Sequence, residues 1–436
     1  MKSVSIFQTV VLALFVFIAI AGVAVFAGFG GVNSKAVPKA TIWGTLPESM
    51  VNEVVRQLNL KSNVVDVTYV AKDPDTFQSD FVNALADGTG PDAVIISDKL
   101  LYSEENKLQP IPYTVFNQRD FLNTYIDGAS VLATSNGILG VPISVDPMVM
   151  YWNKNILAKA GIAAPPKTWG DLQAMGPALI QKTDASDLTQ EMVAMGEYSN
   201  VTNAKDILAT LFFQINNPIT AYNSQSGQMY STIDVAGGDR ARETASATDL
   251  IDFYTSFADP TNANYTWSTA LPSSQDQFLA DDLAFYFGHA SELTTIQDKN
   301  PNLNFDVAQM PANATSSPEV YGTMNIISIV KKTSNYSGAL GVISILTSPE
   351  AIGYWDSLTN LPPVRRDLLS QPVTDPYQTV FNKAAVQSET WLDPDPVQSD
   401  QVFEDMIESV TSGKKKVEDA ITDAKQLLDN LLQAQS

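Results

Sequence analysis

A regular alternation of strand-like and helix-like segments near the start of the chain constrains the fold more than any other feature. Residues 41–43, 64–70 and 93–96 are short runs rich in apolar and β-branched side chains, which predict buried strands. Between them, residues 50–58 and 77–85 carry apolar side chains at helical spacing, and Gly88 ends the second run. Strands that alternate with helices indicate an α/β fold, with a parallel sheet and right-handed crossovers.

The strand ends of such a sheet are the first candidate binding residues. Ligands of open parallel sheets bind at the carboxyl ends of the strands. In this sequence the first strand ends at Trp43, Gly44 and Thr45, and the third is followed by Asp98 and Lys99. We therefore expect these residues to face a ligand.

The N-terminus carries an uninterrupted apolar run. Residues 10–32 are 23 consecutive positions without a charged or strongly polar side chain. A helix needs about 20 such residues to span a bilayer, whereas the core of a cleaved signal peptide has about 7 to 15. The length predicts a single-pass membrane anchor, followed by a short tether, with the body on the extracytoplasmic side. The alternative is a signal peptide cleaved after Ala27.

Composition excludes several classes of function. The 436 residues carry 26 basic and 48 acidic side chains, a net charge of −22, which argues against nucleic acid as a partner. There is no cysteine, so disulfides, thiol nucleophiles and lipoprotein-type attachment are excluded. A single histidine, His289, leaves no HExxH metal site. We expect no metal and no cofactor.

A search for catalytic signatures finds none. The sequence lacks a GxSxG elbow, a GxxxxGK[ST] loop and a GxGxxG motif after a strand. Asp281 and Asp282 form an adjacent acid pair, but neighbouring side chains on a helix or strand point apart, which favours a surface turn. His289 is interpreted as a hydrogen-bonded residue of a pocket wall and not as a lone base. The sequence therefore predicts a protein that is not an enzyme.

A series of motifs along the chain resembles one known family. The motifs are residues 88–94 (GTGPDAV), 140–146 (GVPISVD) with 150–154 (MYWNK), 165–172 (PPKTWGDL), 278–288 (FLADDLAFYFG), 346–350 (LTSPE) and 361–364 (LPPV). In this order they are similar to the extracellular solute-binding proteins of ABC importers, in family 1, the branch that includes maltose-binding protein. The resemblance runs from about Ala40 to the last helix.

The resemblance implies a periplasmic-binding-protein-like fold with two α/β lobes, three interlobe crossing segments and the ligand in the cleft between the lobes. The crossings are expected near residues 145–148, 306–311 and 360–364. The N-terminal lobe would then comprise residues 40–146 with 309–360, and the C-terminal lobe residues 147–308 with 361–436. Residues 1–39 would be the anchor and tether. Periodic apolar residues between Val417 and Leu431 predict a last helix that docks on the body.

The resemblance also suggests ligand contacts. Asp98 and Lys99 lie where relatives place an acidic–basic pair that binds sugar hydroxyls, and Asp146 lies where they place an acidic side chain on the ligand. Next to His289, Ala290 replaces an aromatic that often stacks on a sugar ring. Trp43, Trp355 and Trp391 could supply that platform, although each is also expected as packing. The predicted set is Trp43, Gly44, Thr45, Asp98, Lys99, Asp146, His289 and Trp391.

Asp146 has two interpretations. It could contact the ligand, in which case its replacement should weaken binding. It could instead cap the segment that follows, residues 148–154, because aspartate is a favoured helix cap, and replacement should then lower stability alone.

The expected function is a membrane-tethered binding protein, monomeric, that captures a small solute by lobe closure and serves the permease subunits of an ABC importer. A sugar or oligosaccharide is the favoured solute. Two other functions stay open, namely a surface sensor or interaction module with the same fold, and a hydrolase of an extracellular polysaccharide.

Overall fold

The computed structural model describes residues 37–183, 187–223, 226–235, 246–313 and 318–435. The predicted anchor and most of the tether, residues 1–36, lie outside this part of the chain. Within the described residues, no helix combines the length and apolar character that crossing a bilayer requires.

The N-terminal lobe begins with the predicted alternation. It comprises β1 (Lys39–Gly44), α2 (Glu48–Leu58), β2 (Asp66–Ala71), α3 (Phe77–Asp87) and β3 (Ala93–Ser97). Strand β1 pairs in parallel with β2 on one side and with β3 on the other. Gly88, with φ of 71°, ends α3 in the left-handed conformation that glycine adopts without strain. The α/β prediction for this region is confirmed.

Short elements complete the first part of this lobe. They are η1 (Asp98–Leu100), α4 (Leu101–Glu104), η2 (Glu105–Lys107), β4 (Leu108–Gln109), α5 (Gln118–Thr124), η3 (Asp127–Leu132), β5 (Ala133–Thr134) and β6 (Gly137–Ile138). Two later helices, α12 (Tyr336–Leu346) and α13 (Pro349–Thr359), return to the same lobe.

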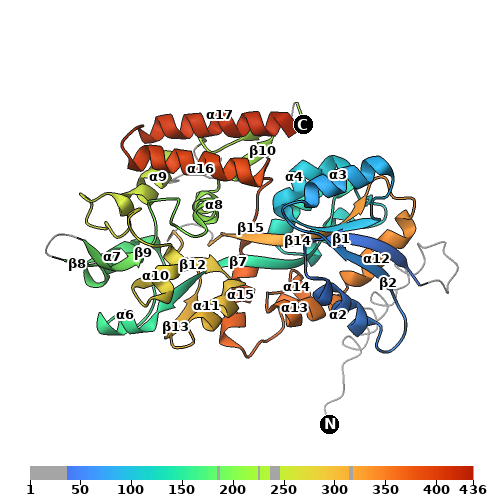
Figure 1. Ribbon diagram of the computed structural model, residues 1–436, viewed down its shortest axis with the longest axis horizontal. Coiled ribbons are helices and arrows are strands. Elements are labelled where there is room, and N and C mark those ends of the chain that lie inside the picture. Colours follow the sequence, from blue (N-terminus) through green and yellow to red (C-terminus); the bar gives the residue numbers. More distant parts are fainter. Residues whose placement is uncertain (1–36, 184–186, 224–225, 236–245, 314–317, 436) are drawn as a thin grey trace, which may run out of the picture.

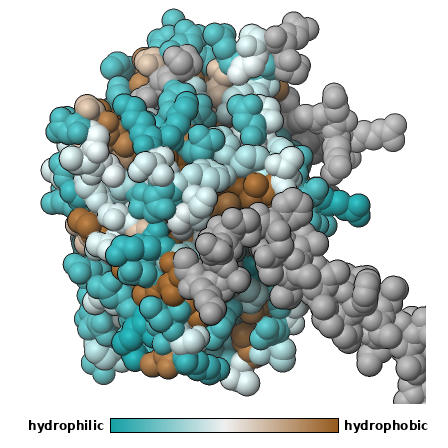
Figure 2. Space-filling view, turned by 90° about the vertical axis from the view of Figure 1, so that its right-hand side faces the viewer, coloured by the Kyte–Doolittle hydropathy of each residue, from teal (hydrophilic) through white to brown (hydrophobic). Residues whose placement is uncertain are grey.

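Hydrophilic side chains dominate the face of the molecule seen in Figure 2, with hydrophobic ones scattered among them.

Two long antiparallel strands join the lobes. Strand β7 (Val141–Asn153) pairs with β14 (Val320–Val330) through its first half and with β12 (Leu283–His289) and β13 (Phe305–Ala308) through its second half. Asp146 and Pro147 lie opposite Thr323 and Gly322 in β14. Both strands therefore pass from lobe to lobe at the same level, side by side (Figure 1).

The C-terminal lobe surrounds the second half of β7. Its middle elements are α6 (Lys154–Lys159), α7 (Trp169–Leu179), β8 (Gln181–Lys182), β9 (Leu188–Val193), α8 (Ala204–Gln214), β10 (Thr220–Tyr222), β11 (Met229–Ser231), α9 (Ala247–Thr255), η4 (Ser256–Ala258), α10 (Ser274–Leu279) and α11 (Glu292–Lys299). The end of the chain adds α15 (Pro376–Val386), β15 (Ser388–Glu389), α16 (Pro396–Thr411) and α17 (Val417–Gln435), whereas α14 (Arg366–Leu369) packs against the N-terminal core.

Each lobe has its own hydrophobic core. The N-terminal core includes Ile42, Val94 and Ile326, and the C-terminal core includes Tyr151 and Phe285. The last helix packs into the C-terminal core through Val417, Ile421, Ala424 and Leu428, as its spacing predicted, and Ala420 joins them. Its final turn reaches the other lobe, where Tyr102 Oη donates a hydrogen bond to the carbonyl of Leu432 (3.0 Å). In Figure 1, α17 lies along the top of the C-terminal lobe and points toward α3 and α4.

The second crossing differs from the prediction. Residues 306–311 do not cross, because β13 pairs with the second half of β7 and Met310 belongs to the C-terminal core. In β14, Tyr321 belongs to the C-terminal core and Met324 to the N-terminal core, so the chain crosses at Gly322 and Thr323. Two extended segments follow one another in this stretch, and local sequence does not distinguish which of them changes lobe. The first crossing, at residues 145–148, lies where it was expected.

The third crossing lies later than predicted. Leu361 packs in the C-terminal core, but Val364 packs in the N-terminal core, and Leu368 and Leu369 of α14 pack against that same core. The chain therefore passes into the C-terminal lobe between α14 and α15, and not at residues 360–364. The acid pair lies in the predicted turn between α10 and β12, where Asp281 has φ of 69°.

Candidate functional site

A cavity lies where the end of β3 meets the starts of α8 and α16. Its volume is about 470 Å³, within the range of roughly 300 to 1,000 Å³ typical of small-molecule sites. The N-terminal lobe contributes Lys99, and the C-terminal lobe contributes every other lining residue: Tyr198, Ser199, Val201, Asn203, Ala204, Lys205, Asp206, Pro396, Asp400 and Glu404. Because both lobes line it, any rotation of one lobe against the other reshapes the cavity.

Strand β3 positions Asp98 and Lys99 at its carboxyl end, as predicted. Asp98 is buried, and this burial raises the pKa of its carboxyl to about 6, against the opposing effect of hydrogen bonds from Thr390 and the backbone of Met324. Burial alone would lower the pKa of Lys99, but the negative charges of Asp206 and Asp98 outweigh it and raise this pKa. Lys99 Nζ lies 3.3 Å from Asp206 Oδ2, which makes an ion pair between the lobes.

Helix α8 presents Asp206 in its first turn. Asn203 precedes the helix in a left-handed conformation (φ of 63°) and donates a hydrogen bond to Glu292 Oε1 (2.7 Å). Burial would raise the pKa of Asp206, but the charge of Lys99 and the hydrogen bond and charge of His289 lower it to about 2. Asp206 is therefore a carboxylate at neutral pH. Its place at a helix N-terminus is also the end of the helix dipole that favours a negative charge.

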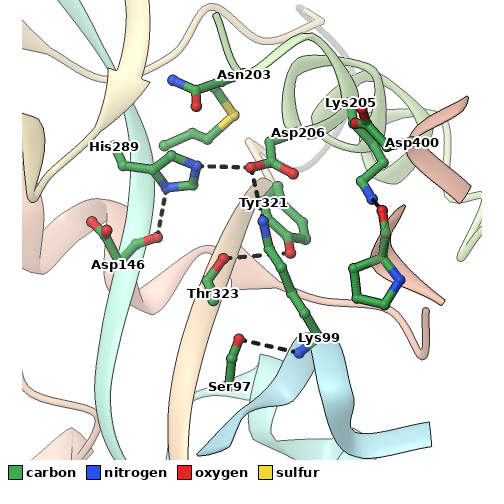
Figure 3. A network of polar contacts seen from close by, with 12 residues as sticks. Ser97, Lys99, Asp146, Asn203, Lys205, Asp206, His289, Tyr321, Thr323 and Asp400 are labelled. Atoms are coloured by element: carbon green, nitrogen blue, oxygen red, sulfur yellow. Dashed lines mark hydrogen bonds and ion pairs between the residues drawn. The ribbon is translucent and has the colours of Figure 1, made fainter. Parts of the chain in front are cut away.

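His289 is the last residue of β12, and its ring lies between Asp206 and Asp146. Its Nε2 lies 3.0 Å from Asp206 Oδ2 and its Nδ1 lies 3.0 Å from the carbonyl oxygen of Asp146 (Figure 3). The ring is buried and packs edge-on against Tyr321, with the ring centroids 6.2 Å apart. Burial works to lower the pKa of His289, yet the contacts with Asp206 and Asp146 raise it to about 9.

The side chain of Asp146 points to a neighbouring backbone and not to the cavity lining. Its Oδ1 accepts a hydrogen bond from the N–H of Ser291 (2.9 Å), the residue before α11. Burial raises the pKa of this carboxyl, against the opposing charge of His289. The following residues, 148–153, are strand and not a capped helix, so the capping contact that the sequence suggested is made to α11 instead.

Trp43, Gly44 and Thr45 lie at the same sheet edge as Lys99 but do not line the cavity. Trp43 is half-buried and stacks under Lys72 Nζ, 3.8 Å from its ring centroid. A Cβ on Gly44 would lie 2.7 Å from the carbonyl oxygen of Ile95, so glycine is required there by close packing of β1 on β3. Gly44 is therefore explained by packing alone.

The other tryptophans considered for stacking are packed in the cores. Trp391 is 4% exposed, and its ring lies edge-on to Phe403. Trp355 is buried and donates from Nε1 to the carbonyl of Leu346 (3.2 Å). Among the lining residues, Tyr198 is the only aromatic, and its hydroxyl donates to Asp400 Oδ1 (2.7 Å).

Sequence reasoning missed Tyr198, Asn203, Asp206 and Asp400. Tyr198 and Asn203 stand in a polar stretch without periodic apolar residues, directly before α8, and Asp206 lies in the first turn of that helix. That helix is buried on all sides, so it shows no polar face from which its orientation could be read. The available signal was a run of polar side chains immediately before a buried helix.

The cavity lining can both donate and accept hydrogen bonds. Carboxylates accept hydrogen bonds, the lysine ammonium donates them, and tyrosine, serine and asparagine do both. Within the described residues, no group of three or more histidine, aspartate or glutamate side chains is arranged to hold a metal ion. A second hollow, about 540 Å³, lies at the far end of α16 and is lined by one lobe only.

Comparison with known proteins finds relatives by sequence and by structure. Matched relatives include binding proteins of Brucella abortus and Brucella suis, 24% identical over 264 residues, which span 59% of this chain and 59% of theirs. The solved structure of the sugar-binding protein MalE from Xanthomonas citri superimposes with a TM-score of 0.73 at 16% identity, covering 91% of this chain and 98% of that one. A cyclo/maltodextrin-binding protein complexed with maltotetraose gives 0.72 at 18% identity, covering 92% and 99%. An extracellular solute-binding protein from Staphylococcus aureus in complex with maltose gives 0.71 at 14% identity, covering 92% and 99%.

The structural likeness establishes the two-lobed fold, and the family follows from the sequence. Residues 53–383, more than half of the chain, match the family model of bacterial extracellular solute-binding proteins. The protein belongs to the bacterial extracellular solute-binding protein family.

Proposed function

We propose that this protein captures a sugar or oligosaccharide in the interlobe cavity and delivers it to the permease of an ABC importer. The observation that carries the proposal is the cavity itself, which is polar and is lined from one lobe by Lys99 and from the other by residues that include Asp206 and Asp400. A ligand that bridges these groups would hold the two lobes together.

The chemistry of the lining supports a carbohydrate. A sugar hydroxyl both donates and accepts, so it can bind a carboxylate, an ammonium or another hydroxyl without carrying charge. The structural relatives described as complexes with maltotetraose and maltose support the same class of ligand. Ala290 offers no ring for stacking and is buried, so Tyr198 is the aromatic face proposed to contact the sugar.

Lobe closure follows from the way the lobes are joined. Gly322 and Thr323 in β14 pair with Pro147 and Asp146 in β7, so the principal hinge is a pair of hydrogen-bonded extended strands. Rotation about such a hinge can close the two lobes over a solute and exclude water from it.

Location and delivery are part of the proposal. The apolar run of residues 10–32 is long enough to hold the protein at the membrane, and the net charge of −22 suits an extracytoplasmic body. Capture next to the membrane would supply a permease directly.

A thermal-shift screen tests the proposal. Full-length protein in detergent is heated with sugars, oligosaccharides, polyols, amino acids and polyamines, since a ligand of the native state raises the melting temperature. We expect shifts with carbohydrates, followed by calorimetric titration of the best one. A shift with polyamines or amino acids alone would refute the carbohydrate assignment, and release of reducing ends from an oligosaccharide would refute a pure binding function.

A further inference from the structure

His289 contacts two groups that can only accept hydrogen bonds. Its Nδ1 faces the backbone carbonyl of Asp146 and its Nε2 faces the carboxylate of Asp206, each at 3.0 Å. A neutral imidazole carries one N–H and one bare nitrogen, so it can satisfy only one of these acceptors. The doubly protonated ring satisfies both. The geometry therefore favours an imidazolium.

The charged groups around the ring favour that state. Asp146 on β7 and Asp206 on α8 are the nearest carboxylates, and Glu292 on α11 accepts the backbone N–H of His289 (2.9 Å). Lys99 on η1 opposes the positive ring, as does burial, while Tyr321 on β14 packs against it. The balance raises the pKa of His289 to about 9.

The same ring determines where Asp206 points. His289 Nε2 and Lys99 Nζ both bind the Oδ2 atom of Asp206, from β12 in one lobe and from η1 in the other. The second oxygen, Oδ1, takes part in neither contact. It is the oxygen left to accept a hydroxyl of a ligand in the cavity.

We infer that His289 is a positioning residue of the proposed site. As an imidazolium it fixes the Asp206 carboxylate and balances its charge. The affinity for a neutral polyhydroxyl ligand therefore depends on the protonation of this one side chain. The inference rests on the proposed function for the ligand. It extends that function by naming the group that orients the acceptor.

The pH window follows from the sign of the shift. A histidine with a raised pKa is charged below its folded pKa and loses its charge as the pH rises through that value. Affinity should therefore be constant between about pH 7 and 8 and fall as the pH passes about 9. Lys99 stays charged in this range, because its own pKa is raised above the ordinary lysine value.

Histidine NMR provides a test that needs no ligand. His289 is the only histidine of the chain, so one labelled ring gives one unambiguous titration, provided that the purification tag contains no histidine. We expect the full-length protein to titrate near pH 9. Asp206→Asn should lower the midpoint by about one pH unit or more, because it removes the nearest charge. Asp400→Asn also removes one negative charge from the cavity wall, but Asp400 does not contact the ring, so the midpoint of the His289 titration should not change.

Two results would overturn the inference in this arm. The first is a midpoint at or below the ordinary histidine value of about 6.5. The second is an Asp206→Asn variant that titrates like the original protein.

Affinity supplies the second arm, using the carbohydrate with the largest thermal shift. His289→Gln carries its donors on a single amide nitrogen and has no charge, so it cannot reproduce the contacts of the two ring nitrogens. We expect binding about tenfold weaker and independent of pH up to about 10. A variant that keeps the original pH profile would overturn the positioning role. If no carbohydrate binds, the proposed function fails, while the histidine titration and its dependence on Asp206 still decide whether the ring positions that carboxylate.

Discussion

Two lysine–aspartate pairs lie next to each other at the start of α8, and they have different roles. Lys205 pairs with Asp393 at 3.1 Å, and its next neighbour, Asp206, pairs with Lys99 at 3.3 Å. The first pair is enclosed within the C-terminal lobe, with side chains 9% and 3% exposed. The second joins the two lobes, and its lysine side chain is 30% exposed.

The difference lies in how fully each lysine is satisfied. Lys205 Nζ also donates to the carbonyl of Pro396 (2.8 Å) and to Ser399 Oγ (3.0 Å), so its three protons have three acceptors. Both lysines line the cavity, but among the described residues Lys99 Nζ has a single hydrogen-bond acceptor, Asp206. The Lys205 ammonium has no N–H left for a ligand, so its pair with Asp393 can only hold α16 against α8. The Lys99 ammonium has N–H donors to spare and lies between the lobes, so it can donate to a ligand.

The largest effect should come from breaking the enclosed pair. Asp393→Ala leaves the Lys205 ammonium buried without its carboxylate, which should cost about 3 to 5 kcal/mol of the free energy of unfolding, measured in urea. The double variant Lys205→Met with Asp393→Leu should recover most of that loss. If Asp393→Ala were as stable as the original protein, the pair of Lys205 and Asp393 would make no contribution to the free energy of unfolding.

Breaking the interlobe pair should affect binding first. Lys99→Met removes a charged hydrogen bond to the ligand, worth about 1.5 to 3 kcal/mol, or roughly 10- to 150-fold in the dissociation constant for the selected sugar. Calorimetric titration measures it. Lys39→Met, which removes an exposed lysine paired with Asp66 far along β1, is the matched control and should bind normally. Equal affinities for the two variants would exclude Lys99 from the site.

The two aspartates should also respond differently to acid. The pKa of Asp206 is lowered from its ordinary value of 3.8 to about 2, so it contributes about 2 kcal/mol of stability above pH 4, and this is lost as the pH falls through 2. Burial raises the pKa of Asp393, so this group loses no stability on protonation. Urea unfolding between pH 2 and 5 should be less steeply dependent on pH in Asp206→Asn than in the original protein. Identical slopes would contradict the lowered pKa.

The smallest effect is expected at Asp146, which helps to frame the site without lining it. Asp146→Ala removes the acceptor for the N–H of Ser291 and should cost about 1 kcal/mol of stability, as loss of a helix cap does. Asp146→Asn keeps an acceptor oxygen and should be near normal. Thermal unfolding and titration of both variants separate the possibilities. A loss of affinity at unchanged stability would instead support the ligand contact that the family resemblance implies.

Local sequence was sufficient where each element depends on its own residues. The strands and helices between Lys39 and Ser97 follow from apolar periodicity, and parallel pairing then places Lys99 at the carboxyl edge. The C-terminal helix is likewise visible in its apolar spacing. These features need no knowledge of distant contacts, because each element has a buried face and an exposed face that differ in composition.

The site depended on contacts that local patterns do not encode. His289 meets Asp206 and Asp146 across 83 and 143 positions of the chain. The sequence by itself determined the two-lobed α/β class, the carboxyl edge of the first sheet and Lys99 as one wall of the site. The tertiary structure alone decided that β14 is the second crossing strand, that Asp206 is the partner of Lys99, and that His289 lies between two acceptors. Hydrogen bonds and charge shifts arise only between groups that folding brings within a few ångströms of one another, however far apart they lie along the chain.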